Sequence, residues 1–120
     1  MTYDFKRKFD YDSRRSESTR ILAKYPDRVP VIVQRSKGRS QDAIPDIDKH
    51  KFLVPQDLSA GQFIYVIRKR IKLDSIQALY LFCGTGILPP TSVMISDLYH
   101  SHKDEDGFLY ISYAGENTFG

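Results

Sequence analysis

The sequence predicts an α+β protein: a mixed four-stranded sheet with a helix packed on one face, preceded by two further helices. Three observations lead to this prediction. The clearest helical segment lies between two pairs of strand-like segments, an order that places a helix across a sheet. The length of 120 residues suits a single domain. The chain is 41% hydrophobic with 28% charged residues, a composition typical of folded proteins.

The N-terminal segment 1–25 is expected to form two helices. Phe5 and Phe9 stand four residues apart, so they meet on one face of a helix. Pro26 ends the second helix, because the residue before a proline avoids the α conformation. The β-branched segment 29–35 then predicts the first strand.

A polar, turn-rich loop over 36–48 connects this strand to a second strand over 50–55. The central helix starts after Ser59, which forms a capping-box pattern with Gln62. Apolar side chains recur on one face as far as Ile71, as expected for a helix that packs on a sheet.

The last third of the chain supplies two strands and a short helix. Residues 78–83 form a nearly continuous apolar run, typical of a buried strand. Thr91 or Ser92 can cap the short helix, and 108–113 predicts the last strand. A polar tail, 114–120, follows. In this order the elements have the β-grasp arrangement.

The net charge of +3 conceals an uneven distribution. Residues 1–40 carry 11 basic and 5 acidic side chains, whereas residues 81–120 carry 1 basic and 5 acidic ones. Basic patches suit nucleic acid, but the sequence has no RNA-binding aromatic motif and its last third is acidic. Nucleic acid is therefore an unlikely partner.

Few residues suggest catalysis. Cys83 ends an apolar strand and is expected to be a buried side chain rather than a nucleophile. The turn 84–86 lacks the further glycines of a phosphate loop, and the three histidines lack metal-ligand spacing. The carboxylates of 104–106 are expected to lack the burial that acid–base catalysis needs. We expect no metal, no cofactor and no enzymatic activity.

Two features indicate binding and conjugation instead. Apolar and basic residues are mixed from His50 to Val54, as in an edge strand that can accept an added peptide strand. The chain ends in Gly120, and glycine has no Cβ, so its carboxylate can enter a narrow enzyme channel and undergo acyl transfer.

Several long blocks run in order along the chain: RRSES (14–18), KYPDRVPVIV (24–33), KFLVP (51–55), GQFIYVIRKRI (61–71), PPTS (89–92), GFLYISY (107–113) and GENTFG (115–120). Together they closely resemble the ubiquitin-like autophagy modifiers of the autophagy-related-protein-eight and GABARAP type. The resemblance implies a ubiquitin-like β-grasp core (26–113), a helical N-terminal extension (1–25) and a flexible C-terminal conjugation tail (114–120).

The resemblance also implies a conjugation cycle. In the family, a cysteine protease exposes the glycine that corresponds to Gly120 and later removes the lipid. An activating enzyme of the ubiquitin type adenylates the carboxylate, and a conjugating enzyme transfers it to phosphatidylethanolamine on autophagosomal membranes. Because no segment is apolar enough for a signal peptide or membrane span, the free protein is expected in the cytoplasm. The conjugate is expected on autophagosomes and related vesicles.

Family members bind aromatic-x-x-aliphatic motifs of cargo receptors, which add a strand beside the second strand. The resemblance implies an aromatic pocket of Glu17, Ile21, Pro30, Lys51, Leu53 and Phe108. It implies an aliphatic pocket of Phe52, Val54, Leu58, Phe63, Val66 and Ile67, of which Val54, Val66 and Ile67 could equally be plain core. Arg28, Lys49, Lys51 and Arg70 would meet acidic residues that flank the motif. The alternative function is an unconjugated peptide-docking adaptor in vesicle traffic or on the cytoskeleton.

Overall fold

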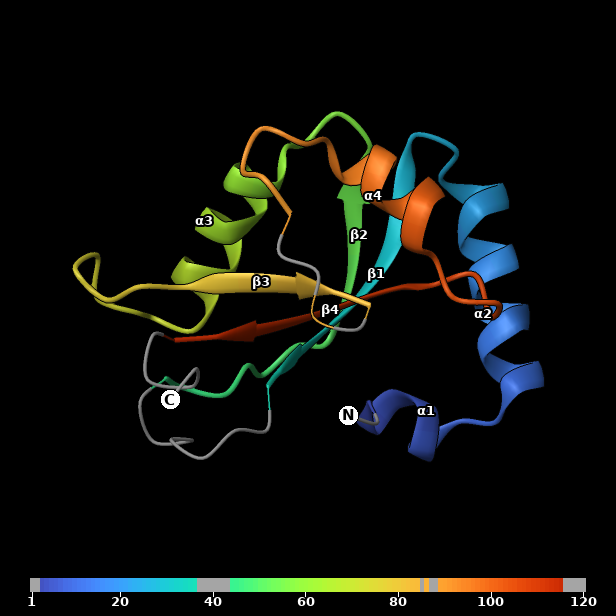
Figure 1. Cartoon of the computed structure of the whole chain (residues 1–120). Coiled ribbons are helices and arrows are strands. Elements are labelled where there is room, and N and C mark those ends of the chain that lie inside the picture. The colour runs from blue at the N-terminus through green and yellow to red at the C-terminus, as the bar shows by residue number, and fades with distance from the viewer. Residues whose placement is uncertain (1–2, 37–43, 85, 87–88, 116–120) are drawn as a thin grey trace.

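The structure is a computed structural model, and it describes residues 3–36, 44–84, 86 and 89–115. Helices and strands follow one another as the sequence predicts (Figure 1). The eight elements are α1 (Asp4–Lys8), α2 (Tyr11–Lys24), β1 (Arg28–Arg35), β2 (Lys51–Pro55), α3 (Ala60–Arg70), β3 (Tyr80–Cys83), α4 (Ile95–His102) and β4 (Leu109–Ala114).

The four strands form one mixed sheet in the order β2-β1-β4-β3. β1 runs antiparallel to β2 and parallel to β4, and β3 runs antiparallel to β4. This arrangement confirms the predicted β-grasp fold. It leaves β2 and β3 as the two edge strands, which matters because an edge strand has unpaired backbone groups on one side.

The two faces of the sheet are covered by different helices. Side chains of α3, including Phe63 and Ile67, pack with Val31 and Leu81 in the main hydrophobic core. The opposite face carries a smaller cluster around Phe108, which residues of α1 and α2 cover. In Figure 1, α3 and the pair α1 and α2 accordingly lie on opposite sides of the strands.

Asp106 connects α2 to the turn before β4. Its carboxylate accepts hydrogen bonds from Arg14 Nη1 (2.6 Å) and from the hydroxyl of Tyr110 (2.5 Å). Beside it, Gly107 has a positive φ of 89°, and a Cβ there would collide with the hydroxyl of Ser18. The expectation that the carboxylates of 104–106 lack burial is wrong for Asp106, which has no exposed surface. The guanidinium of Arg14 pairs with this buried carboxylate, as burial of a charged group requires.

The capping box predicted for the central helix is present. The amide of Gln62 donates to Ser59 Oγ (3.1 Å), and the amide of Ser59 donates to Gln62 Oε1 (2.8 Å). These bonds satisfy donors that a helix start otherwise leaves without partners. Among the described residues, no helix combines the length and the hydrophobicity needed to cross a membrane.

The short helix that Thr91 or Ser92 was expected to cap is instead capped by Met94 and begins at Ile95. The preceding segment forms a turn and a single bridge between Met94 and Ser59, and the carbonyl of Thr91 accepts the amide of Gly61 (2.9 Å) while that of Val93 accepts the amide of Ala60 (2.8 Å). A tertiary contact therefore overrides the local capping preference.

Candidate functional site

The edge strand β2 offers backbone hydrogen bonds to solvent. The amide of Val33 donates to the carbonyl of His50 (2.7 Å), and bonded and non-bonded residue pairs alternate along an antiparallel ladder. In the observed register Lys51 and Leu53 fall at non-bonded positions. Their N–H and C=O groups therefore point away from β1, toward the open edge.

Successive side chains of β2 point to opposite faces of the sheet. Phe52 and Val54 are buried on the α3 face, where the Phe52 ring meets that of Phe63 edge-on with centroids 5.8 Å apart. Lys51 and Leu53 are directed to the face covered by α2, with Lys51 exposed and Leu53 half-buried. The strand thus separates two surfaces, one on each side of the sheet.

The residues expected for the aromatic pocket lie on the α2 face. Lys51 forms an ion pair with Glu17, which links the edge strand to α2. Pro30 stands opposite Leu53 in the β1–β2 ladder. Phe108 is completely buried, so it supports the floor of this surface rather than its wall. The half-buried Ile21 packs against that floor from α2, completing the set of Glu17, Ile21, Pro30, Lys51, Leu53 and Phe108.

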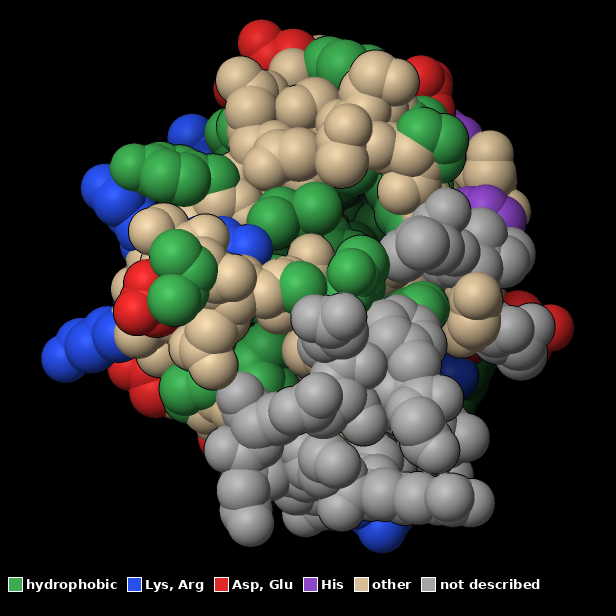
Figure 2. Space-filling view, turned by 60° about the vertical axis from the view of Figure 1, so that its left-hand side comes forward, with side chains coloured by type: hydrophobic (Ala, Val, Ile, Leu, Met, Phe, Trp, Pro, Cys, Tyr) green, Lys and Arg blue, Asp and Glu red, His purple; other side chains and the backbone are tan. Residues whose placement is uncertain are grey.

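The residues expected for the aliphatic pocket lie between β2 and α3. Val54, Phe63 and Ile67 belong to the main core. Leu58 is half-buried, and Val66 is 38% exposed. The space-filling view toward the α3 side shows hydrophobic side chains interrupting the polar surface there (Figure 2). Leu58 and Val66 are therefore the members open to a ligand, with Phe52 and the other three residues behind them.

Arg28 reaches the open edge from the start of β1. Its Nη1 donates a hydrogen bond to the carbonyl of Leu53 (3.1 Å), one of the groups that point away from the sheet. The guanidinium therefore occupies an acceptor that an added strand would use.

Two further basic residues lie near the α3 face of the same strand. The Nε of Arg70 donates to the carboxylate of Asp48 (2.8 Å), and this hydrogen bond lowers the pKa of Asp48. The Nζ of Lys49 lies 4.9 Å from the centroid of the Phe52 ring. Both cations are thus engaged within the chain, and an acidic ligand would compete with these contacts.

A pocket that the sequence analysis did not predict lies between α1 and the sheet, with a volume of about 580 Å³. Its lining includes Phe5, Ile32, Gln34 and Lys51. The helical spacing of Phe5 and its neighbours predicts α1 but not the strand residues that α1 covers, because that contact depends on tertiary packing. Gly120, the residue expected to be conjugated, lies outside the described residues.

The side chains that could be nucleophiles or metal ligands lie apart from this region. Cys83 is buried, and desolvation raises the pKa of its thiol to about 11. Among the residues that the structure describes, no group of three or more His, Cys, Asp or Glu side chains could hold a metal ion. His100 and His102 lie in the last turn of α4.

The burial of Cys83 gives a testable prediction. At pH 8 the folded protein should alkylate with iodoacetamide at least about tenfold more slowly than the urea-unfolded chain, because the thiolate is the nucleophile and burial disfavours it. The measurement is the alkylated fraction over time by intact mass. Equal rates in the folded and unfolded protein would contradict the burial of this thiol.

Comparisons with known proteins give one consistent result. A family model described as the ubiquitin-like autophagy protein Atg8 matches residues 13–120. Autophagy-related protein 8d of Arabidopsis thaliana is 54% identical over 97% of this chain and 93% of its own length. Autophagy-related protein 8 of Scheffersomyces stipitis is 54% identical over 100% of this chain and 84% of its own length. The crystal structure of Trypanosoma brucei ATG8 superposes with a TM-score of 0.91 at 38% identity, covering 100% of both chains.

Proposed function

We propose that this chain, which belongs to the Atg8 family of ubiquitin-like autophagy proteins, is a modifier conjugated through Gly120 to phosphatidylethanolamine. On autophagosomal membranes it recruits cargo receptors and autophagy machinery by docking aromatic-x-x-aliphatic motifs. It acts by binding and by being conjugated, and not as an enzyme.

The observation that carries the docking proposal is the division of β2 into two faces. In an extended peptide, side chains three positions apart point to opposite faces. An aromatic residue and an aliphatic residue at that spacing therefore enter different sides of the sheet. On β2 the surface beside Leu53 faces α2, and the surface beside Leu58 and Val66 faces α3. The motif spacing and the geometry of the edge strand agree.

Backbone groups supply the second part of the docking. Lys51 and Leu53 together present two N–H and two C=O groups at the open edge, and an added strand can pair with them. Two buried side chains at about 1.5–3 kcal/mol each, reduced by the cost of ordering the peptide, correspond to micromolar affinity.

Basic side chains around β2 make the third contribution to docking. When a peptide amide takes the carbonyl of Leu53, the guanidinium of Arg28 is released from that acceptor. It can then pair with an acidic residue that flanks the motif. Three further cations lie near the same strand: Lys49, Lys51 and Arg70. They can pair with other acidic residues that flank the motif.

The conjugation proposal is supported by family membership and by the terminal glycine. A ubiquitin-activating-type enzyme, a conjugating-type enzyme and a cysteine protease that processes and delipidates the protein are the proposed partners. Each buried CH₂ contributes about 0.8 kcal/mol, so the two acyl chains of phosphatidylethanolamine anchor a protein that a single short chain would hold only weakly. The protein is then cytoplasmic when free and on autophagosomes or related vesicles when conjugated.

The second candidate is an unconjugated adaptor in vesicle traffic or on the cytoskeleton. It uses the same edge strand and the basic N-terminal helices, where Lys6, Arg7 and Lys8 lie in α1. The two candidates share peptide docking and differ in whether Gly120 is modified.

The motif spacing tests the docking proposal. An acidic-flanked Trp-x-x-Leu peptide should bind at least about tenfold more tightly than its Trp-x-x-x-Leu counterpart, because the extra residue turns both side chains to one face and removes one buried contact. Isothermal titration calorimetry measures the two affinities. A Trp-x-x-Asp peptide is the control for loss of the aliphatic side chain, and its affinity should equal that of the Trp-x-x-x-Leu peptide. Equal affinities for the two spacings would overturn the proposal.

A further inference from the structure

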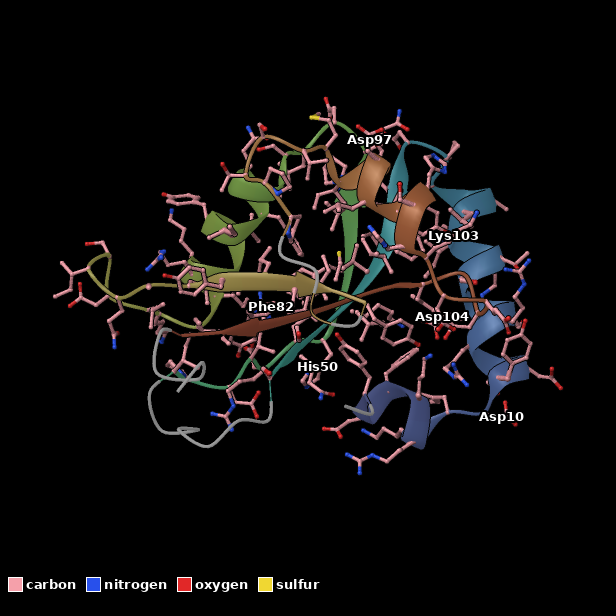
Figure 3. The ribbon with its side chains drawn as sticks, in the orientation of Figure 1. Asp10, His50, Phe82, Asp97, Lys103 and Asp104 are labelled. Carbon is pink, nitrogen blue, oxygen red and sulfur yellow. The ribbon has the colours of Figure 1, made fainter. Side chains whose placement is uncertain are left out.

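The turn between α3 and β3 presents a large apolar side chain to solvent. Ile76 is 87% exposed, more than any other large hydrophobic side chain of the described residues. Leu73 and Leu79 are buried in the main core and hold the turn at both ends. Figure 3 shows the side chains at the tip of this turn, at the left of the view, directed away from the rest of the molecule. Ile76 therefore contributes little to the core and is available to contact another surface.

The backbone of this turn is held by its own side chains. Arg68 Nη1 donates hydrogen bonds to the carbonyls of Asp74 (3.0 Å) and Gln77 (2.7 Å). The amide of Ile76 donates to the carboxylate of Asp74 (3.2 Å), and the amide of Gln77 donates to the Asp74 carbonyl (3.1 Å). Because these polar groups already have partners, the tip of the turn can enter a less polar medium without leaving them unpaired.

The charges on either side of the turn favour an anionic surface. The segment 68–79 contains four basic residues and one acidic residue, Asp74. Lys69, in the last turn of α3, and Lys72, just beyond it, are both exposed. An apolar side chain flanked by cations is typical of segments that lie at the interface of an anionic membrane, where the cations meet the lipid head groups.

The turn lies at the end of the sheet where β4 finishes. Tyr80, the first residue of β3, pairs with Ala114, the last residue of β4. In Figure 1 the turn projects beyond the sheet at this end. Gly120 follows Ala114 by six residues, which span at most about 20–22 Å when fully extended. A lipid on Gly120 therefore keeps this end of the molecule close to the membrane.

We propose that the α3–β3 turn is a membrane contact of the conjugated protein, in which Ile76 enters the head-group region of an anionic bilayer and Lys69 and Lys72 meet its phosphates. The inference rests on the proposed conjugation and adds the orientation of the conjugate to it. The contact is weak in the free protein and forms once the tether raises the effective concentration of the membrane around the turn. Because β2 and β3 are opposite edges of the sheet, this contact leaves the docking strand open.

The test uses tryptophan fluorescence, because the sequence contains no tryptophan. Ile76→Trp places a reporter on the turn. The matched control Ser16→Trp places the same reporter on an exposed position of α2, which Figure 1 shows at the opposite side of the molecule. Purified activating and conjugating enzymes link each variant to vesicles of phosphatidylethanolamine, phosphatidylserine and phosphatidylcholine with brominated acyl chains, which quench tryptophan on contact. Intact mass measures the lipid-linked fraction.

In the conjugate, the tryptophan of Ile76→Trp should be quenched at least about fivefold more than that of Ser16→Trp, because interfacial segments lie about 5–10 Å into the head-group boundary. Without conjugation, the same vesicles should leave Ile76→Trp unquenched. Adding Lys69→Glu and Lys72→Glu to Ile76→Trp should lower the quenching to the value found when phosphatidylserine is omitted, because the attraction to anionic lipid is lost.

A second measurement keeps the natural side chain. The isoleucine methyl groups of the unaltered conjugate are observed by NMR on nanodiscs with and without a spin-labelled lipid. The methyl signal of Ile76 should lose intensity in the presence of the spin label. That of Ile21, which packs on the other face of the sheet, should not.

The outcomes separate this contact from conjugation. If the lipid-linked mass forms but Ile76→Trp is quenched no more than Ser16→Trp, the membrane contact is wrong and conjugation stands. If no lipid-linked mass forms, the proposed conjugation fails and the contact fails with it. If the activating enzyme alone shifts the emission of Ile76→Trp as much as vesicles do, the turn is a protein contact and the lipid assignment is overturned. Equal quenching of Ile76→Trp with and without conjugation would overturn the role of the tether.

Discussion

Leu53→Arg is expected to lower the affinity for an acidic-flanked Trp-x-x-Leu peptide by at least about tenfold, because it removes an apolar contact of about 1.5–3 kcal/mol. Leu53 is half-buried on the α2 face of the edge strand and stands opposite Pro30. A guanidinium at this position also crowds the surface beside Lys51 and has to be desolvated when an aromatic ring docks. Calorimetric titration of the peptide against both proteins measures the effect.

A matched control is Ile76→Arg, which makes the same kind of change at a side chain that is 87% exposed and lies outside the helices and strands. This variant should bind the peptide as the unaltered protein does. The thermal midpoints of both variants show whether the fold is kept. Equal peptide affinities for Leu53→Arg and the unaltered protein would contradict the assignment of the aromatic pocket.

Gly120→Ala is expected to reduce conjugation to phosphatidylethanolamine by about a hundredfold or more. The proposed activating enzyme must bring the terminal carboxylate into line for acyl transfer, and a small displacement of reacting atoms costs about that factor. The added methyl group has no equivalent in glycine and clashes within a narrow channel. Purified activating and conjugating enzymes with vesicles that contain phosphatidylethanolamine reconstitute the reaction, and intact mass measures the lipid-linked fraction.

The same variant should bind the Trp-x-x-Leu peptide with unchanged affinity, because the proposed docking surface lies on β2, α2 and α3. Retained peptide binding shows that a loss of conjugation comes from the terminal residue and not from misfolding. Undiminished lipid attachment by Gly120→Ala would contradict the role assigned to this glycine.

Much of the fold could be predicted from local patterns. The alternation in residues 51–55 predicts a strand with two different faces, and the Ser59–Gln62 pair predicts the start of α3. The residues of each pattern lie within a few positions of one another, so the pattern can be recognised without knowledge of the tertiary structure. The predicted start of α4 was wrong by two or three residues, because the carbonyl of Thr91 bonds to Gly61 instead of continuing into a helix.

Contacts between distant segments could not be predicted. Arg28 and Leu53 are 25 residues apart, and no spacing rule places a guanidinium on that carbonyl. Asp106 looked like an ordinary turn residue, yet Arg14 at a separation of 92 residues pairs with it in the interior. The hydrogen bond from the backbone amide of Asp4 to Gln34 Oε1, across 30 residues, depends in the same way on how α1 lies over the sheet.

Conjugation through Gly120 is tested most directly by the mass of the protein recovered from starved cells, measured in the membrane and soluble fractions. We expect a membrane-bound form in which the carboxylate of Gly120 is linked to phosphatidylethanolamine through an amide. A soluble form ending in an unmodified glycine carboxylate should accompany it. Recovery of only unmodified protein in the membrane fraction of cells that form autophagosomes would rule out conjugation through Gly120 and favour the unconjugated adaptor.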